Sequence, residues 1–283
     1  MVASHHTSAM DRKPWRPTLR WELNWRLAAL KSGFSDAMAY RLEFFLEILG
    51  YAAVPAAVQM VLWYAMFTSG GQATVAGHTY AEMMTYTLTT VIFSQVRGGN
   101  HDFELAEMIR AGTLSQYLLR PVGVVQYVYI QGVAGKLLVA LICLMAGLVA
   151  SPWLGAHPGR LIAAMGLALL GNAIHYQMGA AIAAAAFAWE EAYSVLMVKN
   201  MVVDMLSGEL IPLFLFPASM AWVWKCTPFY LYVYGPTQYA LGQWSHVMFL
   251  QQVGLALLWL MGFMALTHFL WSRGIRKYSA LGG

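Results

Sequence analysis

The segment AEMIRAGTLSQYLLRP, Ala106–Pro121, is a polar, helix-like stretch that lies between two long apolar runs. It ends in an arginine and a proline just before the chain turns apolar again. Polar segments of this kind leave the hydrocarbon region of a bilayer, whereas apolar runs of about 20 residues cross it. The segment therefore divides the chain into separate apolar spans and predicts a helical membrane protein.

Composition supports a bilayer as the surroundings of most of the chain. Of the 283 residues, 59% are hydrophobic and 11% are charged, whereas soluble domains carry about 25% charged residues. The two cysteines, Cys143 and Cys226, are far apart in apolar surroundings, so neither a disulfide framework nor a metal site is expected. His5 and His6 have no further ligands nearby. The first 43 residues are polar and basic, so we expect no signal peptide.

We predict an all-α integral membrane protein with six transmembrane helices. The predicted organisation is a flexible tail at 1–16, an interfacial amphipathic helix at 17–43, a six-span domain at 44–272 and a C-terminal tail at 273–283. The first span runs from about Phe44 to Phe67, the second from about Tyr80 to Val96, and the third ends near Leu154. The fourth covers Leu161 to about Phe187. The fifth starts near Tyr193 and is interrupted after Ser207, and the sixth runs from about Trp244 to Trp271.

The basic residues predict the orientation, because short cytoplasmic segments hold the excess of Lys and Arg. Such residues crowd the N-terminal segment, the connection after the second span and the C-terminal tail, whereas the opposite connections hold only Arg160 and Lys225. Both termini are therefore expected in the cytoplasm, which an even number of spans allows. The segment between the second and third spans is cytoplasmic in this scheme, and Arg97 belongs to it.

The N-terminal segment and the start of the third span both suit the membrane surface. One apolar stripe recurs every three or four residues, as in an amphipathic helix lying on the inner leaflet. It comprises Leu19, Leu23, Leu27, Leu30, Phe34 and Met38. The stretch from Val122 to Gly135 is placed at the inner interface, so that Lys136 is a snorkelling lysine; the alternative is a functional charge.

The fourth span is rich in glycine and alanine, which let helices approach closely in lipid. Asn172, His175 and Gln177 lie within it. We expect interhelical hydrogen bonds from all three, with a ligand role for His175 as the alternative.

The stretch DMLSGELIPLFLFP, Asp204–Pro217, places two carboxylates, a glycine and two prolines where the fifth span should lie. A break of this kind is tolerated when it is buried in protein or lines a cavity, and intramembrane carboxylates face an interior or a water-filled path. We predict that the fifth helix ends near Ser207 and that short re-entrant pieces follow near the outer leaflet. The alternative is a kinked helix with a carboxylate at the outer interface.

Motifs for catalysis are missing from the sequence. There is no GxxxxGK[ST] phosphate loop, no HExxH and no CxxC, and Ser207-Gly208 lacks the preceding Gly-x of intramembrane serine proteases. We expect no catalytic residue in this chain. A free-standing carrier or channel that uses its intramembrane carboxylates is the alternative function, although the inverted repeats common in such carriers are not evident.

Several motifs together resemble the membrane subunits of ABC exporters of the second permease class, in particular a branch with a G-x-L-x-x-x-L-L-R-P signature. That signature corresponds to Gly112, Leu114, Leu118, Leu119, Arg120 and Pro121. The start of the first span also resembles the family, at Tyr40, Arg41 and Phe44, as do the stretches SGELIPLFLFP and TPFYLYVYGP, in which the matching residues are Ser207, Gly208, Ile211, Pro212, Leu213, Pro228, Phe229 and Pro236.

The resemblance implies a cytoplasmic coupling helix between spans 2 and 3 and re-entrant outer helices between spans 5 and 6. The implied ATPase-coupling residues are Asp102, Glu104, Glu107, Arg110, Gly112, Leu118, Leu119, Arg120 and Pro121. The implied translocation path includes Asp204, Ser207, Gly208, Glu209, Pro212, Tyr230 and Tyr234.

The resemblance also implies partners. Separate ABC ATPase subunits would bind ATP and Mg²⁺, and this chain would bind no cofactor. A second permease subunit, identical or related, would complete the transporter in the plasma (inner) membrane, in contact with lipid and with no nucleic acid. A lipid, a glycan, a peptide or a hydrophobic drug would each suit as cargo.

Overall fold

The computed structural model describes residues 18–39, 41–71, 73–99, 101–189 and 191–278, and this part of the chain is helical without any β-strand. The expected tail at 1–16 and Tyr40 lie outside the described residues. The elements are α1 (Leu19–Ala39), α2 (Arg41–Gly70), α3 (Tyr80–Arg97), α4 (His101–Arg110), α5 (Leu114–Leu118), α6 (Val124–Leu154), α7 (Pro158–Ala183), η1 (Ala184–Phe187), α8 (Ala192–Leu206), η2 (Leu213–Leu215), η3 (Ala218–Met220), α9 (Ala221–Lys225), η4 (Phe229–Leu231), α10 (Tyr234–Ala240) and α11 (His246–Lys277).

Four helices in the described part of the chain are long and apolar enough to cross a membrane. They cover Leu49–Gly70, Val124–Leu154, Pro158–Phe187 and His246–Lys277. The other two predicted spans correspond to α3 and α8. Helix α8 has 15 residues, about 22 Å of helix against a hydrocarbon core of about 30 Å. The count of six spans therefore remains a prediction.

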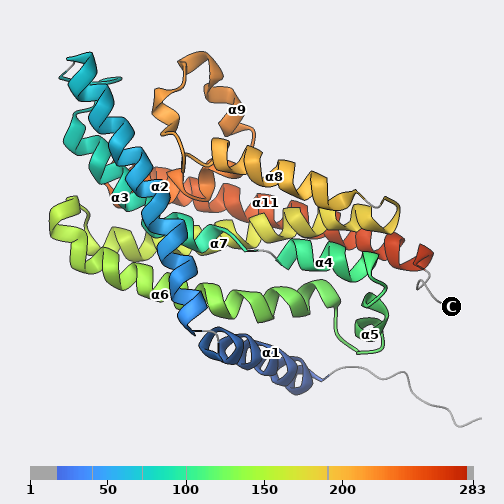
Figure 1. Ribbon diagram of the computed structural model, residues 1–283. Helices are drawn as coiled ribbons and strands as arrows, with labels where there is room; N and C mark the ends of the chain where they lie inside the picture. Colours follow the sequence, from blue (N-terminus) through green and yellow to red (C-terminus); the bar gives the residue numbers. More distant parts are fainter. Residues whose placement is uncertain (1–17, 40, 72, 100, 190, 279–283) are drawn as a thin grey trace, which may run out of the picture.

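Helix α7 is the centre of the bundle and packs against α3, α4, α6, α8, α10 and α11 (Figure 1). Its glycines and alanines allow this crowding. A Cβ atom on Gly171 would lie 3.0 Å from the Cα of Tyr232, so only a residue without a side chain fits without displacing its neighbours. The predicted small-residue face is thus the surface on which the bundle is built.

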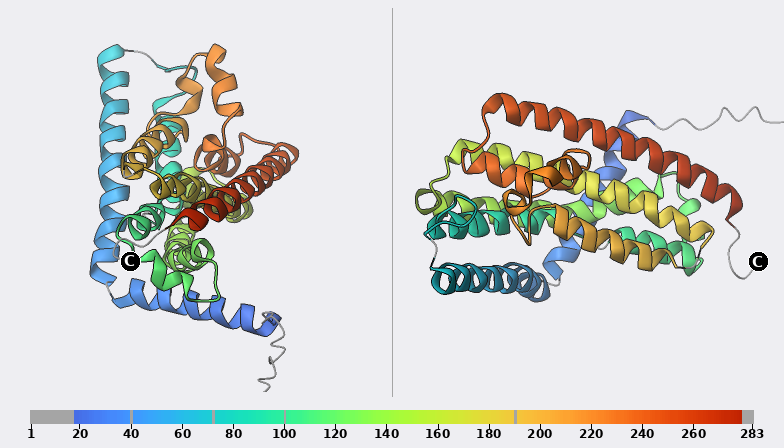
Figure 2. Two further views of the ribbon diagram at one scale, coloured as in Figure 1. Left: turned by 90° about the vertical axis from the view of Figure 1, so that its right-hand side faces the viewer. Right: turned by 90° about the horizontal axis from the view of Figure 1, so that it is seen from above.

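Helix α1 lies across α6 and presents two different faces. Ala29 and Gly33 are buried, and a Cβ atom on Gly33 would collide with the backbone carbonyl of Gln131 on α6. The predicted apolar stripe lies away from this contact, with Leu19, Leu23, Leu27 and Met38 among its exposed members. Figure 2 shows α1 at the edge of the molecule, crossing the direction of α2. An exposed apolar stripe on such a helix suits the membrane surface.

Helix α2 stands beside the bundle and contacts mainly α3 (Figure 2). Its outward side chains are apolar and exposed, including Tyr51, Val54, Val58 and Val61. In a bilayer these side chains can face lipid or another apolar helix.

The third predicted span is one continuous helix of 31 residues, α6. Lys136 on this helix is half-buried, and its Nζ donates to the Gln95 carbonyl at 3.4 Å. The side chain therefore points toward α3 and does not snorkel outward as expected. The reason is that α3 ends beside it with carbonyl groups that accept hydrogen bonds.

The C-terminal end of the sequence-predicted domain 44–272 also needs adjustment. Helix α11 continues to Lys277, so Arg273, Arg276 and Lys277 form its last turns and do not belong to a separate tail.

Candidate functional site

Arg97, the last residue of α3, lies between two carboxylates, one on α8 and one in the turn that follows it. Its Nη2 donates to Asp204 Oδ1 at 2.6 Å and to Glu209 Oε2 at 2.8 Å, and its Nε donates to Glu209 Oε2 at 3.0 Å. The Arg97 side chain is 11% exposed. The sequence placed Arg97 in the connection after the second span, whereas the structure makes it the last residue of α3 and buries its side chain. Opposite charges 107 and 112 residues away draw the side chain inward.

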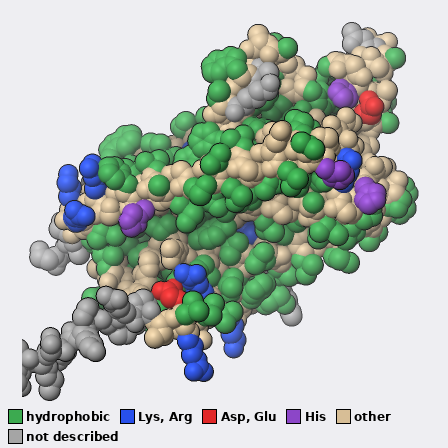
Figure 3. Space-filling view, turned by 180° about the vertical axis from the view of Figure 1, so that it is seen from behind, with side chains coloured by type: hydrophobic (Ala, Val, Ile, Leu, Met, Phe, Trp, Pro, Cys, Tyr) green, Lys and Arg blue, Asp and Glu red, His purple; other side chains and the backbone are tan. Residues whose placement is uncertain are grey.

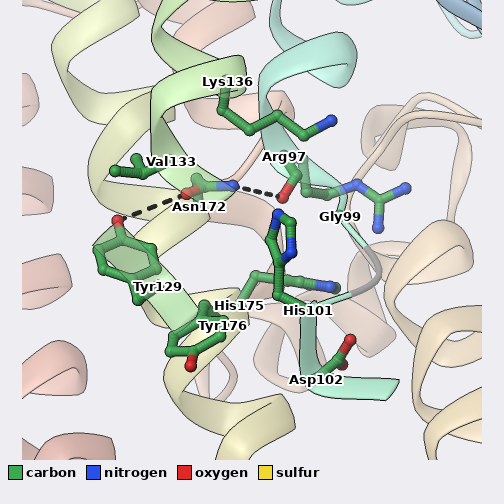
Figure 4. A pocket seen from close by; sticks show the side chains of 10 residues that line it. All are labelled: Arg97, Gly99, His101, Asp102, Tyr129, Val133, Lys136, Asn172, His175 and Tyr176. Carbon is green, nitrogen blue, oxygen red and sulfur yellow. Dashed lines mark hydrogen bonds between the residues drawn. The ribbon is translucent and has the colours of Figure 1, made fainter. Parts of the chain in front are cut away.

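The end of α3 is held by Asn172 on α7. The Asn172 amide donates to the Val96 and Arg97 carbonyls, both at 3.0 Å. The last carbonyls of a helix have no partner within the helix, so this amide takes the place of the missing donors. Figure 4 shows Asn172 between the Tyr129 hydroxyl and the Arg97 carbonyl, with the Arg97 guanidinium pointing away from them. The hydrogen bonds expected from Asn172 are therefore confirmed, and they fix where α3 ends.

A tight turn after α8 places Glu209. Helix α8 ends at Leu206, as predicted, and Gly208 has φ +80°, a conformation that favours glycine. The Tyr86 hydroxyl donates to the Gly208 carbonyl at 2.7 Å, and the Tyr234 amide donates to the Ser207 carbonyl at 2.9 Å. Helices α3 and α10 thus lock the turn from two sides.

A second charge pair lies deeper, between α4 and α8. Lys199 Nζ contacts Asp102 Oδ2, and the two side chains are 4% and 2% exposed. Nε2 of His175 on α7 lies 3.2 Å from Lys199 Nζ. Asp102 was expected on the surface facing an ATPase, and its burial contradicts that expectation. The reason is Lys199, which needs a buried counter-charge.

Lys199 was missed in the sequence, although a signal was present. It is a lone lysine inside the apolar run of α8, and an intramembrane charge predicts a partner or a function. His175 has the interhelical contact that the sequence predicted, but its partner is this lysine.

A groove of about 830 Å³ runs between α2 and the bundle. Asp204, Glu209 and Arg97 line it, together with Lys136 from α6, while Pro55 belongs to its α2 wall. A cavity of about 10 Å³ adjoins it, lined by the residues in Figure 4. The smaller cavity has room for about one water molecule, so only the groove is large enough for an organic ligand.

The predicted path residues fall into three groups. Asp204 and Glu209 line the groove, and Ser207, Gly208 and Pro212 form the turn beside it. Tyr234 packs against Gly208 and does not line the groove. Tyr230 faces elsewhere, because its hydroxyl donates to Gln252 on α11. The structure thus brings together the carboxylates, the turn and Tyr234, which packs against the turn from outside the groove, but not Tyr230.

The predicted coupling residues other than Asp102 form a surface around α4 and α5. Glu104, Glu107 and Arg110 are exposed, and Glu107 pairs with Arg110 at 2.8 Å. Gly112 has φ +75° and ends α4, as a glycine just after a helix commonly does. The remaining predicted residues, Leu118, Leu119, Arg120 and Pro121, are exposed beyond it.

Arg120 lies over two aromatic rings in this surface. Its guanidinium carbon is 5.3 Å from the ring centre of Tyr117 and 5.9 Å from that of Tyr127, so cation–π contacts hold the joint between α5 and α6. Leu119 beside it is 88% exposed. The surface therefore combines charge with an accessible apolar residue, as protein interfaces do.

The described residues contain no group of three or more His, Cys, Asp or Glu side chains arranged to hold a metal ion. Comparison with known protein families gives one finding: the profile described as ABC-2 family transporter protein matches residues 53–282. No curated protein and no solved structure matches the chain.

Proposed function

The chain belongs to the ABC-2 family of transporters and is a multi-pass permease subunit that works with ABC ATPases, and we propose that it forms part of the path of an ATP-driven exporter. The free-standing carrier considered from the sequence is disfavoured, because members of this family depend on partner ATPases. ATP and Mg²⁺ bind to those partners in this proposal.

The observation that carries the proposal is the groove beside α2. One wall holds Arg97, Asp204 and Glu209, and Asp204 keeps 39% of its side chain exposed. The α2 side of the groove is a mainly apolar helix. A volume of about 830 Å³ lies in the range of sites for small organic molecules. A groove with a polar and an apolar wall suits an amphipathic cargo, such as a lipid, a glycolipid, a peptide or a hydrophobic drug.

The surface of α4 and α5 is the proposed docking site for an ATPase. Figure 1 shows α4, α5 and the last turns of α11 at one end of the bundle, opposite the connection between α6 and α7. Figure 3 shows Lys and Arg side chains gathered toward that end, with hydrophobic side chains over the surface between the ends. This distribution supports a cytoplasmic α4 and cytoplasmic termini in the plasma (inner) membrane.

Two further features of the proposal rest on the sequence. The short helices between α8 and α11 are re-entrant pieces at the outer side in the six-span scheme, and the transporter contains two permeases. The second permease is either another copy of this chain or a related chain. The exposed apolar face of α2 is available to contact it or the surrounding lipid.

Copurification tests the docking surface. The tagged full-length chain is extracted from its own membranes in mild detergent, and the ATPase bound to it is measured by ATP hydrolysis per chain. Reversing two exposed charges of α4, Glu104→Lys with Glu107→Lys, should reduce the bound ATPase because complementary charges orient such contacts. Glu22→Lys on α1, where Glu22 pairs with Arg26, is the matched control and should retain it. Equal binding by both variants would reject α4 as the docking site.

Transport itself is measured in vesicles that contain the purified complex. Fluorescently labelled phospholipid is the first probe, and accumulation on the far side of the membrane should require hydrolysable ATP. A complex that hydrolyses ATP and moves no probe of any of the four cargo classes would contradict the proposed path.

A further inference from the structure

The junction between α3 and α4 carries one charge at each end, and both charges are paired with α8 or the turn that follows it. Arg97 ends α3 and binds Asp204, whereas Asp102 lies in the first turn of α4 and binds Lys199. The order of charges is opposite on the two partners. Arg97, the cation of the junction, pairs with the anion Asp204 on α8. Asp102, the anion of the junction, pairs with the cation Lys199 on the same helix.

The chain between these charges is poorly suited to transmit a movement by itself. Gly98 and Gly99 follow Arg97 directly, and glycine has the greatest backbone freedom of any residue. A displacement of α4 can therefore be absorbed by the backbone before it reaches α3. The side-chain pairs bypass this stretch because they join the junction directly to another helix.

Helix α7 supports both pairs along one side. Asn172 holds the carbonyls at the end of α3, and His175 contacts Lys199 one turn later. Gly179, a further turn along, faces Asp102, whose carboxylate a Cβ atom at that position would overlap. Positions 172, 175 and 179 share one helical face. This face of α7 therefore packs against the end of α3 and against the Lys199–Asp102 pair.

The buried pair is an unusual choice if stability is its only purpose. Removing two charges from water costs several kcal/mol for each ion, and replacing a buried ion pair by apolar residues is often neutral or stabilising. Its charges do, however, define one partner and one register. They hold α4 in a single position against α8, which an apolar contact would define less strictly.

We propose that two ion pairs form a fastening between the α3–α4 junction and α8. Lys199–Asp102 ties α8 to α4, and Arg97–Asp204 ties α8 to the end of α3, so that α8 moves together with α4 and carries the end of α3 with it. Lys199, Asp102 and Arg97 are positioning residues in this mechanism. An ATPase that displaces α4 then displaces α8 and, through Asp204, the wall of the groove. This inference rests on the proposed function, and it assigns the step between the docking surface and the path.

The experiment uses the full permease–ATPase complex and needs no knowledge of the cargo. Spin labels on cysteines that replace exposed residues report two distances, in a background where Cys143 and Cys226 are replaced by alanine. One pair, Ala111→Cys directly after α4 and Met201→Cys on α8, measures the fastening; Ala111 is exposed and is not one of the proposed docking residues. The other, Val54→Cys on α2 and Met201→Cys, measures the groove. Both are recorded without nucleotide and with ATP trapped by vanadate.

The wild-type α4–α8 distance should stay constant to within about 2 Å, the size of an ordinary helix shift, while the α2–α8 distance changes with nucleotide. In Asp102→Asn with Lys199→Met, which keeps the side-chain sizes but removes both charges, the α2–α8 change should be lost while ATP hydrolysis continues. In Asp102→Lys with Lys199→Asp, the two charges are exchanged, so the pair can form again. Return of the nucleotide-dependent change in the α2–α8 distance in this variant would add support. Glu22→Gln with Arg26→Met, an exposed pair on α1, is the control and should respond like the wild type.

The outcomes separate this inference from the proposed function. A wild-type α2–α8 distance that ignores nucleotide rejects the proposed function and the fastening with it. If the α2–α8 distance changes with nucleotide in the wild type and changes equally in Asp102→Asn with Lys199→Met, the fastening is rejected while the proposed function stands. A wild-type α4–α8 distance that changes by several ångströms also rejects it, and this result does not depend on whether any charge variant folds.

Discussion

The two charge clusters of the junction have similar chemistry but different surroundings. Lys199 and Asp102 are closed inside the bundle, whereas Asp204 and Glu209 keep 39% and 20% of their side chains exposed beside the groove. Bulk water can stabilise the open cluster when a partner is lost, whereas the closed pair borders only a cavity with room for about one water molecule. Ion pairs at the same junction therefore serve different purposes. The closed pair fixes the position of α4 against α8, whereas the open cluster places charged side chains along the groove.

Breaking the closed pair should have the largest effect on stability. Lys199→Ala leaves the Asp102 carboxylate buried without its cation, which costs about 3–5 kcal/mol in such pairs. Thermal unfolding of the purified chain in detergent measures the loss. Asp204→Asn is the counterpart in the open cluster and should cost much less, because Arg97 retains Glu209. Equal losses in the two variants would show that the clusters do not differ in solvent access.

Crowding the closed pair without changing its charges should have an intermediate effect. In Gly179→Ala, the added methyl group overlaps the Asp102 carboxylate, and overpacking of this kind costs about 1–3 kcal/mol. Gly166→Ala on the same helix meets open space and should be neutral or slightly stabilising, because alanine is the better helix former. A Gly179→Ala variant as stable as Gly166→Ala would place α4 farther from α7 than described.

Straining the turn of the open cluster should have the smallest effect of the three. Gly208→Ala places a side chain at φ +80° and 2.9 Å from the Tyr234 Cβ, which we expect to cost about 1–2 kcal/mol. The turn borders the groove, so the α2–α8 label distance should shift even without nucleotide. An unchanged distance in a folded variant would separate the turn from the shape of the groove.

Much of the helical plan could be predicted from the sequence because its signals are local. The end of α8 follows from Ser207 and Gly208, the end of α4 from Gly112, and the packing face of α7 from its small residues. The exposed stripe of α1 likewise follows from a regular spacing of leucines. Each of these features depends on residues within a few positions of one another.

The candidate site was predicted only in part. The carboxylates Asp204 and Glu209 were identified because charges in an apolar run are conspicuous. Asp102 was placed on a surface and Arg97 in a loop, since each belongs to a polar stretch whose local composition suits solvent. Tyr230 was assigned to the path by its position in an aromatic segment, but its hydroxyl bonds to Gln252.

The sequence by itself determined the class of protein and the ends of particular helices, such as α8 at Ser207 and α4 at Gly112. Hydropathy, turn residues and helical spacing are properties of neighbouring residues, so they can be read along the chain. Only the tertiary structure decided which charges meet. Lys199 and Asp102 are 97 residues apart, and Arg97 and Asp204 are 107 apart. Over such separations the partner of a charge is chosen by how helices pack around α7, and no local pattern records that choice.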